Sequence, residues 1–535
     1  MKIIVCDPIS TKGIELLKQR PEFNVVVLDK TATEDELCAL VGDATALLVR
    51  SETKVTKKVI EAAKQLKVVG RAGVGVDNVK VEDATQHGVV VMNTPLGNMV
   101  TTAELAFALM MALARKVPQA AAGLAGGKWL RKELAKDGIE LQGKTLGIIG
   151  LGRIGSEVAK RAIAFGMKVV AYDPFLPEER AKAIGATLAD LDEVYRVADF
   201  ITLHNLVTDE TRGMLNAAAF SKMKPNVRIV NCARGEIINE NDLIAALESK
   251  KVAGAALDVF AKEPLPADHP YIAQAAKGNL ILTPHLGAST KEAQEKCGIE
   301  VAEIVIAYLL TGEVRNAVNL PYLDAKTSEQ VKPYLPLGEA LGKLLAQLST
   351  GADKLHITYG GNAKNLTNID PVTRAIIRGF LSTSNLKDVN NVNVRSVAQS
   401  IGITVEEKKS DEPVTFNEWV HVQAFKGAEK LISAGGTFFG SPNNPRIVRL
   451  FSQPVEIPTS GTLLLLNNAD KPGIVGLLGT LLAKHKINIA SMSLGRDTAG
   501  GKALTVLSLD SEPPQAVLDE LKKDTDISNV KVVKL

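Results

Sequence analysis

The feature that most constrains this chain is a glycine-rich turn between an apolar segment and a helix-forming segment. The stretch KTLGIIGLGRIG fits the pattern GxGxxG at Gly150, Gly152 and Gly155. The first glycine allows a tight turn, the second lets the backbone approach a pyrophosphate, and the third lets helix and strand pack closely. Exposed N–H groups at the helix start favour phosphate. The pattern predicts a dinucleotide site, with a ligand-free strand–helix turn as the alternative.

The acidic residue that follows the glycine-rich turn indicates which dinucleotide binds. Asp173 ends the next apolar segment, KVVAYD, about 20 residues beyond the glycines. Its carboxylate can accept hydrogen bonds from both ribose hydroxyls and would repel a 2′-phosphate. The sequence therefore predicts NAD rather than NADP, with FAD or another dinucleotide as a further alternative.

The turn belongs to the second of two similar units. In residues 1–97, five short Val/Ile-rich segments alternate with helical patterns, as in a parallel sheet covered on both faces. Residues 98–289 repeat this alternation, and residues 288–310 form a long helical pattern that can lead the chain back to the first unit. The apolar stretch 101–124 is either a central core helix or a helix buried by a second subunit.

Residues 321–535 differ in composition and pattern from the first two units. Residues 321–458 are rich in Gly, Asn, Thr and Ser and contain period-2 segments, which predicts a mixed α/β domain without a recognisable chemical motif. Residues 459–535 follow the order βαββαβ of a ferredoxin-like module. The predicted fold class is therefore α/β: two Rossmann-like parallel-sheet domains, a mixed α/β intervening domain and a C-terminal ferredoxin-like domain.

Composition excludes several classes of function. The net charge of +3 is too small to indicate nucleic acid or an anionic membrane as a partner. The apolar runs are too short to predict a membrane-spanning helix. Four widely spaced cysteines have neither zinc-site spacing nor a CxxC pair, so we expect reduced thiols, a cytoplasmic protein and no metal site.

Three polar residues after strand-like segments of the second unit form a candidate reactive set. Arg234 follows IVNCA, Glu263 follows LDVFAK, and His285 follows ILTP. Oxidation of a 2-hydroxy acid needs a base, a group that tunes the base and a cation that holds the carboxylate. Each residue alone also has an alternative without a catalytic role. Arg234 would form a surface ion pair, Glu263 would be a solvated loop acid, and His285 would be a hydrogen-bonded loop histidine. Asp258, ending GAALD, either meets the cofactor amide or caps a loop.

Five blocks together resemble the D-2-hydroxyacid dehydrogenase family: LGIIGLGRIG, AYDP, VNCARGEII, AALDVFAKEP and TPHLGAST. The resemblance covers about residues 1–320 and implies that Arg234, Glu263 and His285 are catalytic. It implies the following cofactor contacts: Val74, Gly150, Gly152, Arg153, Ile154, Gly155, Asp173, Asn205, Cys232, Ala233, Arg234, Asp258, His285, Gly287 and Ala288.

Within this family the chain is similar to the long-form D-3-phosphoglycerate dehydrogenases, through LLVRSETKVT, VVGRAGVGVDNV, VMNTPLGN and GKWLRKE. That branch oxidises 3-phosphoglycerate with NAD, as the first step of serine biosynthesis, and carries an intervening domain and a C-terminal ACT domain. The similarity implies that arginines hold the substrate phosphate and that the AGVG backbone holds its carboxylate. The implied substrate contacts are Arg50, Ser51, Arg71, Gly73, Val74, Gly75, Asn98, Arg234 and His285.

The C-terminal segment carries NNADKPGIVG and INIAS, which resemble the ACT effector motif. This places an amino-acid effector, L-serine, at Asn468, Asp470 and Asn488, at an interface between subunits of a homodimer or homotetramer. A tail that only builds oligomers is the alternative. For the whole chain, the alternatives are a glyoxylate or hydroxypyruvate reductase, an NAD-sensing binding protein on the same fold, and an amino-acid sensor with an inactive dehydrogenase half.

Overall fold

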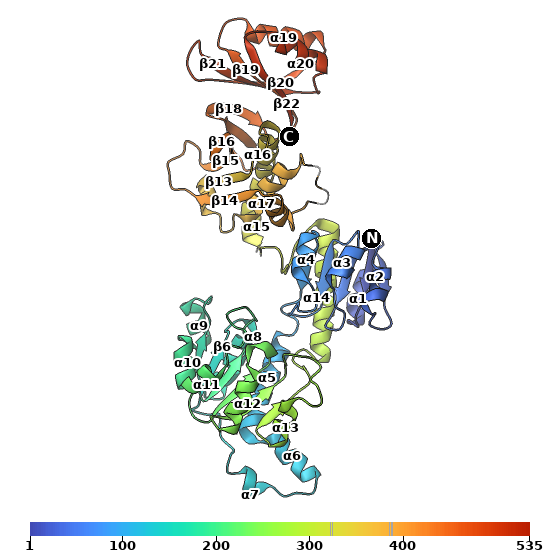
Figure 1. Ribbon diagram of the computed structural model, residues 1–535, viewed down its shortest axis with the longest axis vertical. Coiled ribbons are helices and arrows are strands. Elements are labelled where there is room, and N and C mark those ends of the chain that lie inside the picture. Colours follow the sequence, from blue (N-terminus) through green and yellow to red (C-terminus); the bar gives the residue numbers. More distant parts are fainter. Residues whose placement is uncertain (322, 324, 385, 387–388) are drawn as a thin grey trace.

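The computed structural model describes the chain except for residues 322, 324, 385 and 387–388. Its described part forms four β-sheets, arranged along the long axis of the molecule (Figure 1). The two N-terminal sheets are parallel throughout, the third is mixed and the fourth is antiparallel. The predicted α/β class is confirmed. No helix in the described ranges is long and apolar enough to cross a bilayer.

The first sheet has the order β2-β1-β3-β4-β5. Apart from the edge strand β2, its strands are mostly buried, because helices α1–α4 and the later helix α14 cover the sheet, as the near-continuous Val/Ile runs predict. These elements are β1 (Lys2–Val5), α1 (Thr11–Lys18), β2 (Asn24–Val27), α2 (Glu34–Leu40), β3 (Ala44–Val49), α3 (Lys57–Ala62), β4 (Val68–Arg71), α4 (Val81–Gln86), β5 (Val90–Asn93) and the returning α14 (Lys291–Thr311).

The second sheet has the order β12-β11-β10-β9-β6-β7-β8, and its six longer strands coincide with the predicted segments. The two-residue strand β8 was not predicted. The elements are α5 (Met99–Arg115), α6 (Val117–Ala125), α7 (Arg131–Leu134), β6 (Thr145–Ile149), α8 (Arg153–Ala164), β7 (Lys168–Tyr172), α9 (Glu178–Ile184), β8 (Thr187–Leu188), α10 (Leu191–Val197), β9 (Phe200–Leu203), α11 (Ala217–Lys222), β10 (Val227–Asn231), η1 (Gly235–Ile237), α12 (Glu240–Glu248), β11 (Val252–Leu257), α13 (Pro270–Ala276) and β12 (Leu280–Leu282).

The long apolar stretch divides into two helices with different surroundings. Pro118 lacks an N–H and would clash with the preceding turn, so α5 ends and Lys116 takes a left-handed conformation. Helix α5 is a core helix, packed against α8, β10 and β11. Helix α6 has no buried residue, and Leu124 and nearby Trp129 are 61% and 76% exposed. The core-helix alternative therefore describes α5. The exposed apolar side chains of and after α6 fit the alternative of burial by a second subunit.

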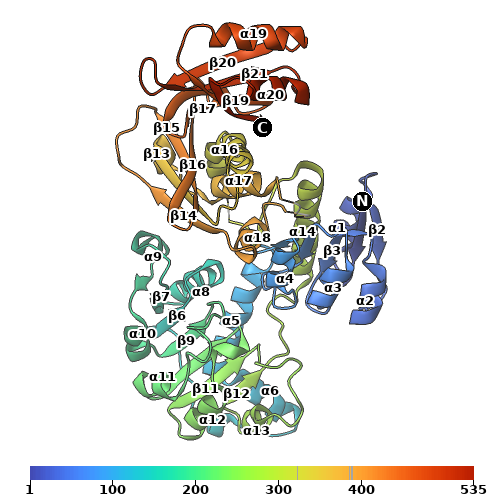
Figure 2. The same cartoon turned by 45° about the horizontal axis from the view of Figure 1, so that its top comes forward.

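The third unit packs helices against one face of the sheet β14-β13-β15-β16-β17-β18. Asn390 donates to the carbonyl oxygen of Gly88 at 2.8 Å, which ties this unit to the first, where α18 lies beside α4 (Figure 2). The elements are α15 (Ala325–Val331), α16 (Tyr334–Leu348), β13 (Lys354–Gly361), η2 (Asn362–Asn365), α17 (Asp370–Leu381), α18 (Val394–Ser400), β14 (Thr404–Lys409), β15 (Glu418–Lys426), β16 (Glu429–Phe438), β17 (Pro445–Leu450) and β18 (Gln453–Pro458).

The C-terminal unit has the predicted βαββαβ order, and its sheet runs β20-β21-β19-β22. It docks on the third unit partly through Gln347, whose amide donates to the Lys534 carbonyl oxygen and accepts from the Lys534 N–H. The elements are β19 (Thr462–Ala469), α19 (Ile474–Lys484), β20 (Ile489–Arg496), β21 (Lys502–Leu509), α20 (Gln515–Lys522) and β22 (Ile527–Lys534).

Candidate active site

A cleft of about 350 Å³ lies between the first two units. The loops that line it from the second unit follow the carboxyl ends of β6, β9, β10, β11 and β12, where open α/β sheets bind ligands. The cleft brings together these predicted residues: Ser51, Arg71, Val74, Gly75, Asn98, Ile154, Asn205, Cys232, Ala233, Arg234, Glu263, His285, Gly287 and Ala288.

His285 and Glu263 form the predicted hydrogen-bonded pair. His285 Nδ1 lies 2.7 Å from Glu263 Oε2, and the other carboxylate oxygen accepts from the Phe260 N–H at 3.0 Å. Burial alone would raise the pKa of Glu263, but the hydrogen bonds from His285 and Phe260 outweigh it and hold that pKa below its ordinary value. An ionised Glu263 favours the tautomer with its proton on Nδ1, which leaves Nε2 free to accept a proton.

Asp258 holds the loop that carries His285. Its fully buried carboxylate accepts from the Thr283 hydroxyl at 2.6 Å and from the N–H groups of Leu286 and Gly287 at 2.8 Å each. Its carbonyl oxygen accepts from the His285 N–H at 3.0 Å. Of the two roles that the sequence left open, the structure shows the loop cap, because both carboxylate oxygens face this loop.

Arg234 reaches across the cleft to the first unit. Its Nε lies 3.0 Å and its Nη2 2.9 Å from Asp77 Oδ2. A Cβ at Gly75 would lie 1.7 Å from Arg234 Nη2, so only glycine leaves room for the guanidinium. Asp77 thus occupies the guanidinium fork of Arg234. Sequence reasoning missed Asp77; the signal was its position directly after AGVGV.

Arg71 approaches the same backbone from the other side. A Cβ at Gly73 would lie 1.6 Å from Arg71 Nη1, and Gly73 has a φ of +143°. Burial, followed by repulsion from Arg234, lowers the pKa of Arg71 to about 10. Arg71 Nε and Asn98 Oδ1 are buried without a hydrogen-bond partner among the described residues. Two cations therefore converge on this backbone, as an anionic ligand requires.

Arg50 lies outside the cleft. Its side chain lines an adjoining pocket of about 300 Å³ together with Lys12 and Lys291, and Ala288 borders both spaces. Its N–H donates to the buried carboxylate of Asp7 at 2.6 Å, which fixes the turn after β3. Ser51, the next residue, faces the cleft itself.

The glycine-rich turn has the geometry that a pyrophosphate needs. Gly150 has a φ of +92°, and a Cβ at Gly155 would lie 2.1 Å from the Gly150 carbonyl oxygen. A Cβ at Gly152 would meet no protein atom within 4 Å, so this position faces open space at the start of α8. Asp173 accepts from the Leu151 N–H at 3.0 Å and keeps lone pairs for ribose hydroxyls. Arg153 is exposed on the first turn of α8. These residues fit a dinucleotide.

The middle of the cleft contains further groups without protein partners. Asn205 Oδ1 and His204 Nδ1 are buried and make no hydrogen bond within the described ranges. Burial lowers the pKa of His204 to about 4, and its Nε2 lies 2.9 Å from the Thr202 hydroxyl. Burial also raises the pKa of the Cys232 thiol. His204 is therefore a neutral group available to a ligand. Sequence reasoning missed it, although its place at the end of β9 was the signal.

The predicted effector residues do not meet within one chain. Asn468 is buried and accepts from the Thr505 hydroxyl at 2.8 Å, while Asp470 accepts from Arg496 and the Gly500 N–H. Asn488 donates to Asp510 at the opposite end of the sheet. Ala503, opposite Asn468, and Leu509, opposite Ile489, are six residues apart on β21, which is roughly 20 Å.

Three family models match this chain. The first, D-isomer specific 2-hydroxyacid dehydrogenase, NAD binding domain, matches residues 107–287. The second, D-3-phosphoglycerate dehydrogenase intervening domain, matches residues 330–451, and the third, ACT domain, matches residues 462–526. The predicted cofactor class and the presence of an ACT domain are confirmed.

Relatives named D-3-phosphoglycerate dehydrogenase match over the whole length. The protein of Synechocystis sp. is 44% identical, with 100% of this chain and 95% of the relative covered, and that of Archaeoglobus fulgidus is 42% identical, with 100% of both covered. The structure of cofactor (NAD⁺)-bound 3-phosphoglycerate dehydrogenase from Entamoeba histolytica is 30% identical, with a TM-score of 0.51 over 60% of this chain and 99% of that one.

Two glycine substitutions separate the roles of the turn. Gly152→Ala adds a methyl group where no protein atom lies, so we expect an unchanged melting temperature but NAD binding weakened about tenfold or more, as backbone and pyrophosphate are pushed apart. Gly155→Ala places a methyl group against the Gly150 carbonyl, so we expect destabilisation of about 1–3 kcal/mol. Differential scanning fluorimetry and NAD titration measure both. Full NAD affinity in Gly152→Ala would contradict the assignment.

Proposed function

Since this chain belongs to the D-3-phosphoglycerate dehydrogenase family, we propose that it oxidises the C2 hydroxyl of 3-phosphoglycerate with NAD. The product is 3-phosphohydroxypyruvate, and the reaction is the first step of L-serine biosynthesis. The observation that carries this proposal is the His285–Glu263 hydrogen bond of 2.7 Å, in a cleft that also contains Arg234 and Ile154 of the helix that follows the glycine turn. An assembled acid–base pair favours turnover over a protein that only senses NAD.

His285 acts as the base. Its Nε2 accepts the C2 hydroxyl proton, and the Glu263 carboxylate stabilises the imidazolium that forms. Bound NAD supplies the acceptor for the hydride that leaves C2. Asp258 keeps the base in place by holding Leu286 and Gly287. In the reverse direction His285 returns the proton to the carbonyl oxygen.

The substrate anion groups meet the two arginines. Arg234 exchanges Asp77 for the substrate carboxylate, which the N–H groups of residues 73–75 also approach. Arg71, Ser51 and Asn98 face the remaining part of the cleft, where the phosphate is held. Arg50 contributes from the adjoining pocket as a second, more distant cation. These contacts distinguish a phosphorylated substrate from glyoxylate or hydroxypyruvate.

Each of the four sheets belongs to a domain with its own role. Residues 1–97 and 290–320 bind the substrate, and residues 98–289 bind NAD. Residues 321–458 form the intervening domain, and residues 459–535 form the regulatory ACT domain. Because Asn468 and Asn488 lie at opposite ends of one sheet, an L-serine site that uses both needs two copies of the chain.

We further infer that the protein forms a homodimer or homotetramer in the cytoplasm. The exposed apolar residues Val117, Leu124 and Trp129 offer a second surface for self-association. The cysteines, which are unpaired and mostly buried, suit a reducing compartment.

His285→Ala tests the base. We expect turnover to fall about 10²–10⁴-fold, the contribution of a positioned general base, while the dissociation constant for NAD changes by less than about threefold. Steady-state kinetics and fluorescence titration give the two numbers. If NAD binding is lost together with turnover, the ring holds the cofactor rather than the proton.

Arg71→Ala tests the phosphate contact. Loss of a charged hydrogen bond costs about 1.5–3 kcal/mol, so we expect KM for 3-phosphoglycerate to rise about 10- to 100-fold, against a small change for D-glycerate. Arg50→Ala should change KM in the same direction but less, because Arg50 faces the adjoining pocket. An equal effect on both substrates would remove the phosphate assignment.

L-Serine tests the ACT site. Binding to the folded state should raise the melting temperature by a few degrees at saturating serine, because a ligand at about 100 times its dissociation constant contributes about 2.7 kcal/mol. D-Serine serves as the matched control, and Asn488→Ala should abolish the shift. If millimolar L-serine gives no shift, the module serves only as architecture.

A further inference from the structure

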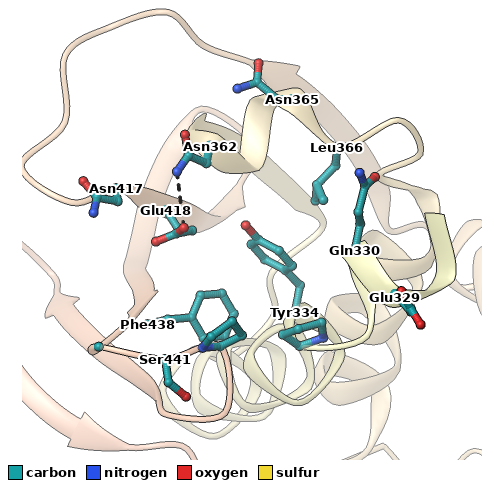
Figure 3. Close-up of a pocket in the computed structure, with 13 residues that line it drawn as sticks. Glu329, Gln330, Tyr334, Asn362, Asn365, Leu366, Asn417, Glu418, Phe438 and Ser441 are labelled. Carbon is teal, nitrogen blue, oxygen red and sulfur yellow. Dashed lines mark hydrogen bonds between the residues drawn. The ribbon is translucent and has the colours of Figure 1, made fainter. Parts of the chain in front are cut away.

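The third unit contains a separate cavity, of about 480 Å³, in a region where the sequence shows no chemical motif. This volume is in the range of small-molecule sites. One wall comes from α15, the start of α16 and η2, and the other from the start of β15 and the loop after β16 (Figure 3). A ligand in this cavity would therefore contact both α15, the first helix of this unit, and the sheet of the unit.

The charged side chains among the described lining residues are all acidic. Glu329 and Glu418 contribute two carboxylates, and no lysine or arginine is among the described residues that form the walls. Side-chain amides from Gln330, Asn362 and Asn365 add acceptor oxygens as well as donors. Glu418 accepts one hydrogen bond, from Asn362 Nδ2 at 3.3 Å, which leaves most of its lone pairs free. Phosphate or carboxylate ligands would be repelled here, whereas a cation would be attracted.

Tyr334 supplies a hydroxyl group without a hydrogen-bond partner among the described residues. The residue is 7% exposed, and its hydroxyl points into the cavity, where it makes no hydrogen bond with any described residue (Figure 3). Burial, followed by the charge of Glu418, raises the pKa of this phenol to about 12, so it stays neutral. Most of the side chain is buried while its hydroxyl faces the cavity, so a ligand donor can take the place of the water that would hydrate it.

Aromatic rings form the floor beside these acceptors. The rings of Tyr334 and Phe438 lie 4.9 Å apart at 90°. Aromatic faces attract ammonium and guanidinium groups, with a preference for sites removed from water. Carboxylate, neutral hydroxyl and ring faces together select for a positive charge that carries N–H donors.

We propose that this cavity binds a small organic cation, a guanidinium or primary amine on a short carbon chain, with its charge against Glu418 and its chain against Tyr334 and Phe438. The site is separate from the dehydrogenase cleft, because all its described lining residues belong to residues 329–442.

Calorimetric titration of the full chain with butylguanidinium tests this proposal, with butylurea as the neutral probe of the same shape. We expect saturable binding in the millimolar range for the cation, as suits a ligand with few heavy atoms, and at least tenfold weaker binding for the urea. Glu418→Gln keeps an acceptor for Asn362 but removes the charge, and should weaken cation binding about tenfold or more, as expected for a charged hydrogen bond. Tyr334→Phe should weaken it about 2- to 10-fold.

Glu429→Gln is the matched control, because Glu429 begins the strand that Phe438 ends, nine residues and roughly 30 Å away. It should leave binding unchanged, and none of the three variants should alter turnover with NAD. Equal binding of butylurea, binding of inorganic phosphate instead, or full cation affinity in Glu418→Gln would overturn the proposal. If Glu418→Gln does not fold, unchanged cation affinity in Tyr334→Phe would overturn the proposal.

Discussion

The hydrogen bonds accepted by Asp258 are the constraint on which the cleft depends. This buried carboxylate holds the Thr283 hydroxyl and the N–H groups of Leu286 and Gly287, and its carbonyl oxygen accepts from the His285 N–H. His285 consequently keeps a left-handed backbone with a φ of +52°. That conformation is uncommon for a residue with a Cβ, and it persists because the loop has several fixed contacts. The position of the base is thus set before any ligand binds.

The same cleft holds two arginines close to one another. Arg71 and Arg234 flank one glycine-containing backbone segment, and their mutual repulsion contributes to the lowered pKa of Arg71. Asp77 neutralises Arg234 across the two units, but it is 72% exposed, so its ion pair is weak. A substrate carboxylate can replace it at little cost. The proposed reaction therefore begins with an exchange of one carboxylate for another.

Periodic segments and motifs predicted most of the fold, because buried parallel strands leave continuous apolar runs. The order of the five blocks also predicted the His285–Glu263 pair. Sequence alone did not decide between the two roles of Asp258, since only the loop geometry shows where its oxygens point. It did not reveal the break at Lys116, the place of Arg50 outside the cleft, or the distance between Asn468 and Asn488. Each of these depends on the packing of segments far apart in the chain.

We propose that this cleft transfers a hydride from C2 of 3-phosphoglycerate to NAD. The most direct measurement uses 3-phosphoglycerate carrying deuterium at C2 and examines the reduced cofactor by NMR. We expect one deuterium at C4 of the nicotinamide and a slower hydride-transfer step than with protium. Reduction of NAD without deuterium at C4, or no reduction at all with this substrate, would contradict this proposal.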